Sequence, residues 1–189
     1  MSENLRTFIA VKINPVSELI DFINEWREVF EGETIKWVDK DNLHLTLKFL
    51  GKTSKDQISE IENILMEIAS QHFNFSFDLR GIGYFKTRGF PSVLFVGIND
   101  FWQMKVIAEE LENRLSDLGL VKDKREFKPH LTIGRIKYLK NKKRFYEFVE
   151  KYKDKSIQKV LVSGIIFYQS ILKQQGPEYI PLQITQLNS

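Results

Sequence analysis

The sequence predicts an α+β fold of two pseudo-symmetric lobes, each an antiparallel sheet with helices packed outside it. Predicted strands often follow one another directly along the chain, which is typical of antiparallel sheets rather than of a doubly wound parallel sheet. The pattern His-Leu-Thr-aliphatic occurs at 44–47 and again at 130–133, although the chain has only three histidines. Such a repeat indicates two related halves. We therefore expect residues 1–189 to form a single domain of two lobes around a shared cleft.

The first half of the chain alternates strand-like and helical segments. Segment 5–13 is rich in Phe, Ile and Val and predicts a strand. Apolar residues recur at helical spacing over 16–30, with Pro15 and Ser17 as start signals. The other elements expected in this half are a short strand at 37–38, a strand at 43–50 and a helix at 54–71.

The second half begins with a clean alternation of Phe and polar residues over 73–79, which predicts a strand. Glycines at 81, 83 and 89, followed by Pro91, break up the next stretch. The remaining expected elements are a strand at 92–98, a helix at 101–118, a strand at 130–136, a helix at 141–155 and strands at 159–168 and 178–184.

Composition narrows the class of protein. A chain of 189 residues with 42% hydrophobic residues can bury a full core. The absence of cysteine excludes disulfides, thiolate metal sites and cysteine nucleophiles. No stretch approaches the roughly 18 apolar residues of a membrane span, and no signal peptide is recognisable, so we expect a cytoplasmic protein. The net charge of +3 is compatible with a phosphate-bearing ligand. No exposed heptad pattern stands out, and we expect a monomer.

Each copy of the repeated motif has a polar and an apolar side if it forms a strand, because alternate side chains share a face. His44, Thr46 and Lys48 then point one way, and the apolar residues of the first copy point the other. His130 and Thr132 share a face in the second copy. The apolar residues expected to face the core are Leu43, Leu45, Leu47, Phe49, Leu131 and Ile133.

Two imidazoles and two hydroxyls in one cleft suit phosphodiester chemistry. A neutral imidazole can take a proton from water, and a protonated one can give a proton to a leaving oxygen. Threonine hydroxyls can donate to the phosphate oxygens that gain charge in the transition state. Neither histidine has the neighbouring carboxylates of a metal site, and no Gly-rich phosphate loop is present. A single histidine on a strand is more often structural than catalytic, and the repetition is what favours catalysis here.

Five stretches carry a resemblance to a known family. The chain resembles the two-histidine phosphoesterase superfamily and, more closely, the RNA 2′,3′-cyclic phosphodiesterases of bacteria and archaea, also called 2′-5′ RNA ligases. The stretches follow the family's order and span nearly the whole chain: 6–10, 37–51, 89–97, 127–135 and 169–179.

The resemblance implies a two-lobed α+β fold with the active site in the cleft between the lobes. It also implies hydrolysis of a ribose 2′,3′-cyclic phosphate to a 2′-phosphate without metal or cofactor, on RNA ends or small cyclic nucleotides. It makes His44 the proton donor to the 3′ oxygen and His130 the proton acceptor that activates water; from the residues alone, the two are equivalent. Thr46 and Thr132 would hold the phosphate. The same site run backward would join ends through a 2′-5′ linkage. The alternative is a non-catalytic module that grips RNA ends.

Other residues allow either a functional interpretation or an ordinary structural one, such as solvent exposure or core packing. Lys48 could contact phosphate or be a solvated strand lysine, and Lys128 could steer RNA or be solvated in a loop. Tyr84 could stack on a base, as could Phe85, for which core packing is at least as plausible. Arg135 has the parity of Leu131, so we expect it to face away from the cleft unless Gly134 permits a bulge.

Overall fold

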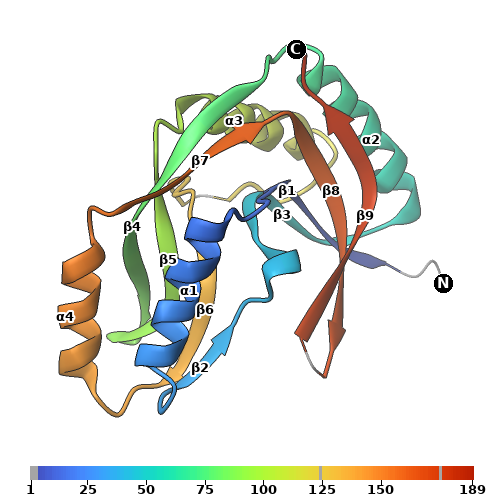
Figure 1. The fold of residues 1–189 in the computed structure, drawn as a ribbon. Helices are drawn as coiled ribbons and strands as arrows, with labels where there is room; N and C mark the ends of the chain where they lie inside the picture. Colours follow the sequence, from blue (N-terminus) through green and yellow to red (C-terminus); the bar gives the residue numbers. More distant parts are fainter. Residues whose placement is uncertain (1–3, 124, 175) are drawn as a thin grey trace.

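The strands form two antiparallel sheets, shown in Figure 1. The structure is a computed structural model that describes residues 4–123, 125–174 and 176–189. The first sheet has the order β3-β1-β8-β9. Its strands are β1 (Leu5–Lys12), β3 (His44–Thr53), β8 (Gly164–Lys173) and β9 (Gly176–Gln186).

The second sheet repeats this arrangement with one strand added at its edge, in the order β2-β6-β5-β4-β7. Strand β6 carries the second motif and pairs with β5, as β3 carries the first motif and pairs with β1. The strands are β2 (Thr34–Trp37), β4 (Phe75–Thr87), β5 (Phe90–Asn99), β6 (Leu131–Tyr138) and β7 (Ser156–Val162). The expectation of two lobes, each with its own antiparallel sheet, is confirmed.

The helices are exchanged between the lobes. Helix α1 (Ser17–Val29) follows β1 of the first sheet but packs with α4 (Lys142–Tyr152) on the second. Helix α3 (Trp102–Ser116) follows β5 of the second sheet but packs with α2 (Lys55–Ala69) on the first. Each lobe therefore contains a helix from both halves of the chain, which ties the two lobes together.

Local signals explain where the helices lie. Helix α2 begins at a capping box, in which the Ser54 hydroxyl accepts from the Gln57 backbone and the Gln57 side chain accepts from the Ser54 backbone. Its apolar residues Ile61, Leu65 and Ile68 are fully buried against the first sheet. Among the described residues, we find no helix with the length and apolar character needed to cross a membrane.

The expected single strand at 159–168 is wrong. The segment is two strands, β7 and β8, that join at Ser163 and belong to different sheets. The segment is apolar except at Lys159, Ser163 and Gly164, so the break is not evident in the sequence. Gly164 marks it, since a Cβ there would lie 2.9 Å from the Thr185 carbonyl oxygen across the β8–β9 pair. This passage from β7 to β8 carries the chain from one lobe to the other.

The strand expected at 73–79 is longer in the structure, because β4 continues to Thr87. Gly81 and Gly83, which we expected to break up the chain, lie inside it. Gly81 has φ of 71°, and a Cβ there would clash with the Lys153 carbonyl oxygen. A Cβ at Gly83 would lie 2.6 Å from the Phe95 ring. Both glycines allow another part of the chain to approach the strand closely, rather than ending it.

Candidate functional site

The two motif histidines are held in the same way. His44 is the first residue of β3, and His130 directly precedes β6. Nδ1 of His44 lies 2.7 Å from the Asn42 carbonyl oxygen, and Nδ1 of His130 lies 2.8 Å from the Lys128 carbonyl oxygen. Because a carbonyl only accepts, both Nδ1 atoms must carry the proton. Nε2 of each ring is thereby left available for proton transfer.

Each motif strand has a β-bulge at the same motif position. On β3 the register jumps from Thr46 to Lys48, so Leu47 is the extra residue. On β6 it jumps from Thr132 to Gly134, so Ile133 is the extra residue. A bulge reverses the alternation of side chains beyond it. The face that carries the histidine and threonine, here called the histidine face, therefore continues at Phe49 and Arg135.

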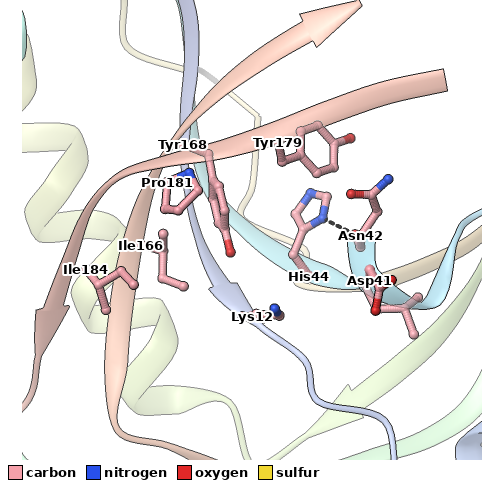
Figure 2. A pocket seen from close by; sticks show the side chains of 10 residues that line it. Lys12, Asp41, Asn42, His44, Ile166, Tyr168, Tyr179, Pro181 and Ile184 are labelled. Atoms are coloured by element: carbon pink, nitrogen blue, oxygen red, sulfur yellow. Dashed lines mark hydrogen bonds between the residues drawn. The ribbon is translucent and has the colours of Figure 1, made fainter. Parts of the chain in front are cut away.

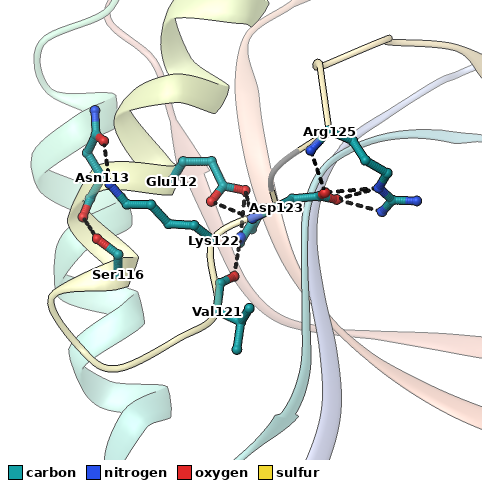
Figure 3. A network of polar contacts seen from close by, with 8 residues as sticks. Glu112, Asn113, Ser116, Val121, Lys122, Asp123 and Arg125 are labelled. Carbon is teal, nitrogen blue, oxygen red and sulfur yellow. Dashed lines mark hydrogen bonds and ion pairs between the residues drawn. The ribbon is translucent and has the colours of Figure 1, made fainter.

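The first bulge turns Lys48 into the protein interior. Its side chain is 4% exposed, and Nζ lies 2.5 Å from Glu112 Oε1 on α3 and 2.9 Å from the Val121 carbonyl oxygen. Glu112 also accepts from the Asp123 backbone N–H (Figure 3). The expectation that Lys48 shares the histidine face is wrong, because the Leu47 bulge reverses its direction. Lys48 instead anchors the start of the segment that leads to His130.

The bulges also correct the expectations for Phe49 and Arg135. Phe49, expected in the core, is 62% exposed, and its ring lies 6.1 Å from that of Phe8, which in turn lies 5.1 Å from His44. Arg135, expected to face away, is exposed and lowers the pKa of both histidines through its charge. We expected Arg135 to face away unless Gly134 permitted a bulge. That bulge is present, directly before Gly134.

Electrostatics favour neutral imidazoles. Burial lowers the pKa of His44; the Asn42 carbonyl opposes this, and the positive charges of Arg135 and His130 add to it. Burial likewise lowers the pKa of His130, with the Lys128 carbonyl opposing and Arg135 adding. Since Arg135 acts on both rings, the two histidines and the guanidinium lie within electrostatic reach of one another. Thr46 and Thr132, on the same faces, are half-buried.

Aromatic rings surround His44 (Figure 2). Tyr179 of β9 lies edge-on at 5.0 Å, and Phe8 of β1 lies at 5.1 Å and stacks on Tyr168 of β8. Burial raises the pKa of both tyrosines, so their hydroxyls keep their protons and can donate hydrogen bonds. A pocket opens beside the imidazole, between β8, β9 and the turn at 41–43.

Aromatic rings also surround His130. Phe85 contacts His130 edge-on at 4.7 Å, and Phe95 lies at 5.4 Å. Tyr84 packs instead against Phe145 and Tyr146 of α4, on the other face of β4. Of the two neighbours, Phe85 therefore contacts the motif histidine and Tyr84 does not.

The remaining candidate, Lys128, and two other basic residues lie at the edge of the site or outside it. The Lys128 side chain is 66% exposed and pairs with Glu126 at 3.2 Å, while its backbone orients His130. Arg125 is bound to Asp123. His72, at the end of α2, lies 2.9 Å from Glu110. In the described ranges, no three His, Asp or Glu side chains are grouped so that they could hold a metal ion.

Several site residues gave no clear signal in the sequence. Phe8 and Tyr179 belong to stretches of the family resemblance, but nothing in their spacing relates them to His44. They reach it because β8 and β9, from the end of the chain, add to β1 in one sheet. Arg135 could have been found by assuming a bulge at Gly134.

Comparison with known proteins shows the family to which these residues belong. The model of the LigT-like phosphoesterase family matches residues 13–95 and 102–179. A Methanocaldococcus jannaschii protein described as an RNA 2′,3′-cyclic phosphodiesterase is 35% identical over 175 residues, which cover 93% of this chain and 96% of the relative. A Thermotoga maritima protein of the same description is 35% identical over 180 residues, covering 93% and 91%.

Solved structures share the fold. A Thermus thermophilus protein superposes with a TM-score of 0.79 at 26% identity, covering 97% of this chain and 98% of that one. Escherichia coli LigT in complex with 3′-AMP superposes with a TM-score of 0.78 at 23% identity, covering 99% and 100%.

Proposed function

This chain belongs to the LigT-like phosphoesterase family and is a phosphodiesterase, and we propose that it hydrolyses RNA 2′,3′-cyclic phosphate ends to 2′-phosphates by two-histidine acid–base catalysis. One observation carries the proposal: each histidine donates its Nδ1 hydrogen to the backbone carbonyl two residues before it, which leaves both Nε2 atoms free. In this proposal residues 1–189 act as one domain, with the site between its lobes.

The reaction needs one proton taken and one proton given. His130 Nε2 takes a proton from water as the water oxygen bonds to phosphorus. As the bond from phosphorus to the 3′ oxygen breaks, His44 Nε2 gives its proton to that oxygen. The product is a 2′-phosphate with a free 3′ hydroxyl, and exchange with solvent restores both rings. The assignment of donor and acceptor follows the family resemblance.

Phosphate charge needs partners as well as proton transfer. The hydroxyls of Thr46 and Thr132 share the faces of the two histidines and would donate to the non-bridging oxygens. Arg135 would supply positive charge to the transition state, since its guanidinium is close enough to both imidazoles to lower the pKa of each. Phe49 offers an exposed ring on the other histidine face, suited to stacking with a base.

The relatives support the substrate class. Two relatives with about a third of their residues identical to this chain are described as RNA 2′,3′-cyclic phosphodiesterases. A neighbour in fold, E. coli LigT, binds 3′-AMP. Chemistry with two imidazoles, two hydroxyls and a guanidinium balances without a metal ion, so we propose a metal-independent reaction. Its reversal would form a 2′-5′ linkage from a cyclic phosphate and a 5′ hydroxyl.

A non-catalytic RNA-end-binding module is the competing function. A module that only binds the phosphate of an RNA end would need cationic side chains, and Arg and Lys supply positive charge better than neutral imidazoles do. The lowered pKa of both histidines therefore favours proton transfer over simple anion binding.

Incubation with a nucleoside 2′,3′-cyclic phosphate, with and without a chelator, tests the proposal. We expect turnover to the 2′-phosphate isomer at a rate that the chelator does not change. Absence of turnover would favour the binding module. Turnover that the chelator abolishes would overturn the metal-independent mechanism, and a 3′-phosphate product would reverse the assignment of the leaving oxygen.

A further inference from the structure

The pocket beside His44 reaches across the first sheet to β8 and β9, whereas Phe49 lies on the edge strand β3 (Figure 2). The buried ring of Phe8 on β1 lies between the two. It stacks on Tyr168, which lines the pocket, and lies 6.1 Å from the Phe49 ring. Phe8 therefore separates the exposed ring of Phe49 from the pocket.

The lining of the pocket combines an apolar surface with a cation. Ile166, Pro181 and Ile184 form the apolar part, and Ile184 is 57% exposed. Lys12 supplies an ammonium group, and Tyr168 points its hydroxyl into the space. The volume is about 160 Å³, close to the roughly 150 Å³ cavity that holds one benzene ring. The pocket thus suits a flat ring with an anion next to it.

We propose that this pocket binds the penultimate nucleotide of an RNA, with its base against Ile166 and Ile184 and its linking phosphate at Lys12. The inference rests on the proposed function. In a 2′,3′-cyclic end, both ribose hydroxyls are joined to phosphorus, so the rest of the RNA can leave only through the 5′ oxygen. His44 protonates the ribose 3′ oxygen, which puts the ribose beside His44.

The place of the pocket fits this path of the RNA chain. The 5′ oxygen belongs to the ribose beside His44, and the pocket is a hollow lined by the same imidazole. Phe49 remains for the terminal base. Asp41 at the rim of the pocket can accept a hydrogen bond from a ribose 2′ hydroxyl, the group that distinguishes RNA from DNA. The enzyme is therefore specific for RNA ends of two or more nucleotides over free cyclic mononucleotides.

The test compares two substrates that share the terminal cyclic nucleoside, a mononucleotide and a dinucleotide. We expect a higher kcat/KM for the dinucleotide with the wild-type protein. Lys12→Glu should lower kcat/KM for the dinucleotide about tenfold, since it replaces an ion pair with a repulsion, and should change that for the mononucleotide less than about twofold. Ile184→Asp should discriminate in the same direction.

Lys55→Glu is the matched control. Lys55 is exposed at the start of α2, which packs on the outer face of the first sheet. The Lys55→Glu variant changes the charge by the same amount away from the pocket and should leave kcat/KM unchanged for both substrates. Lys12 and Ile184 are exposed, so their variants should keep the wild-type circular dichroism spectrum and melting temperature.

Three outcomes would overturn the proposal. Equal losses for both substrates would put the terminal nucleoside in the pocket, and no loss for either would leave the pocket without a nucleotide. A loss equalled by Lys55→Glu would make the effect one of net charge. If the wild-type protein turned over neither substrate, the proposed function would fail instead. Calorimetric binding of a dinucleotide with a terminal 2′-phosphate, with and without Lys12→Glu, would then still decide what the pocket binds.

Discussion

The two copies of the His-Leu-Thr motif are alike through their fourth residue and differ at the fifth and sixth. Both hold Nδ1 on a carbonyl, and both bulge at the fourth residue. After the bulge, the first copy has buried Lys48 and exposed Phe49, and the second has Gly134 and exposed Arg135. The shared part supplies the paired imidazoles. The differing part makes one side of the site aromatic and the other cationic.

The fifth residue differs because the lobes are built differently. A Cβ at Gly134 would lie 3.0 Å from the Ile35 side chain and 3.3 Å from the Trp37 side chain, so the close approach of β2 favours glycine there. Within the described part of the chain, the first sheet has no equivalent of β2 outside β3. The corresponding residue, Lys48, reaches Glu112 on α3 instead. The asymmetry of the site is thus coupled to the asymmetry of the fold.

Removing either imidazole should have the largest effect. His44→Ala and His130→Ala should each lower kcat for a 2′,3′-cyclic nucleotide about 10²-fold or more, the usual contribution of a positioned acid or base. His72→Ala is the control, because His72 pairs with Glu110 outside the site. Near-wild-type activity in either motif variant would contradict the paired-imidazole mechanism.

Substitutions at the sixth residue of each motif copy should separate the effect of charge from the effect of base stacking. We expect Arg135→Ala to lower kcat/KM about tenfold to 10²-fold, because the phosphate loses its cation in the transition state. Phe49→Ala should raise KM about tenfold with little change in kcat, as expected for the loss of one stacked base. Steady-state kinetics on a cyclic mononucleotide measures both effects. If the two variants had the same effect on kcat and KM, the sixth residues would not differ in role.

The pH profile should report the lowered pKa values of both rings. The base must be neutral, and a lowered pKa keeps it neutral further into the acid range. The acid must be protonated, and a lowered pKa makes it lose its proton earlier as pH rises. The bell-shaped profile of kcat/KM, which reflects the free enzyme, should therefore have its maximum below pH 6.5, the ordinary pKa of histidine.

Arg135→Ala should shift this profile toward higher pH, since the guanidinium lowers the pKa of both histidines. Lys143→Ala on α4 removes a charge that is not among the causes of either shift and should leave the profile in place. A shift toward lower pH in Arg135→Ala would contradict the electrostatic account.

Substitutions at the fifth residue of each motif copy should affect the free energy of unfolding more than catalysis. Lys48→Met leaves Glu112 without its cation and should lower the free energy of unfolding by about 2 kcal/mol, a value reduced because Glu112 is partly exposed. Gly134→Ala should cost about 1 kcal/mol through the contact with Ile35. Urea denaturation measures both, with exposed Lys52→Met as the control. Unchanged stability in Lys48→Met would mean that the ion pair does not hold the segment before β6.

The sequence was sufficient to predict the fold class and the two motif strands that carry the histidines, because periodicity and the repeat are local signals. Simple alternation failed at the bulges, since Leu47 and Ile133 are apolar residues that fit a regular strand equally well. One extra residue on each strand reversed Lys48, Phe49 and Arg135 together. The wall formed by Phe8, Tyr168 and Tyr179 depends on strand order across the whole chain, and no local pattern predicts it.

The central claim is that the two similar histidines have unequal roles, and a substrate with sulfur in place of the 3′ oxygen tests it most directly. A thiolate leaves without needing a proton, so the substrate bypasses the acid but still requires the base. We predict that His44→Ala hydrolyses the sulfur substrate at close to the wild-type rate, while His130→Ala remains about 10²-fold slower. Rescue of His130→Ala instead of His44→Ala would reverse the two roles, and rescue of neither would contradict the acid–base mechanism.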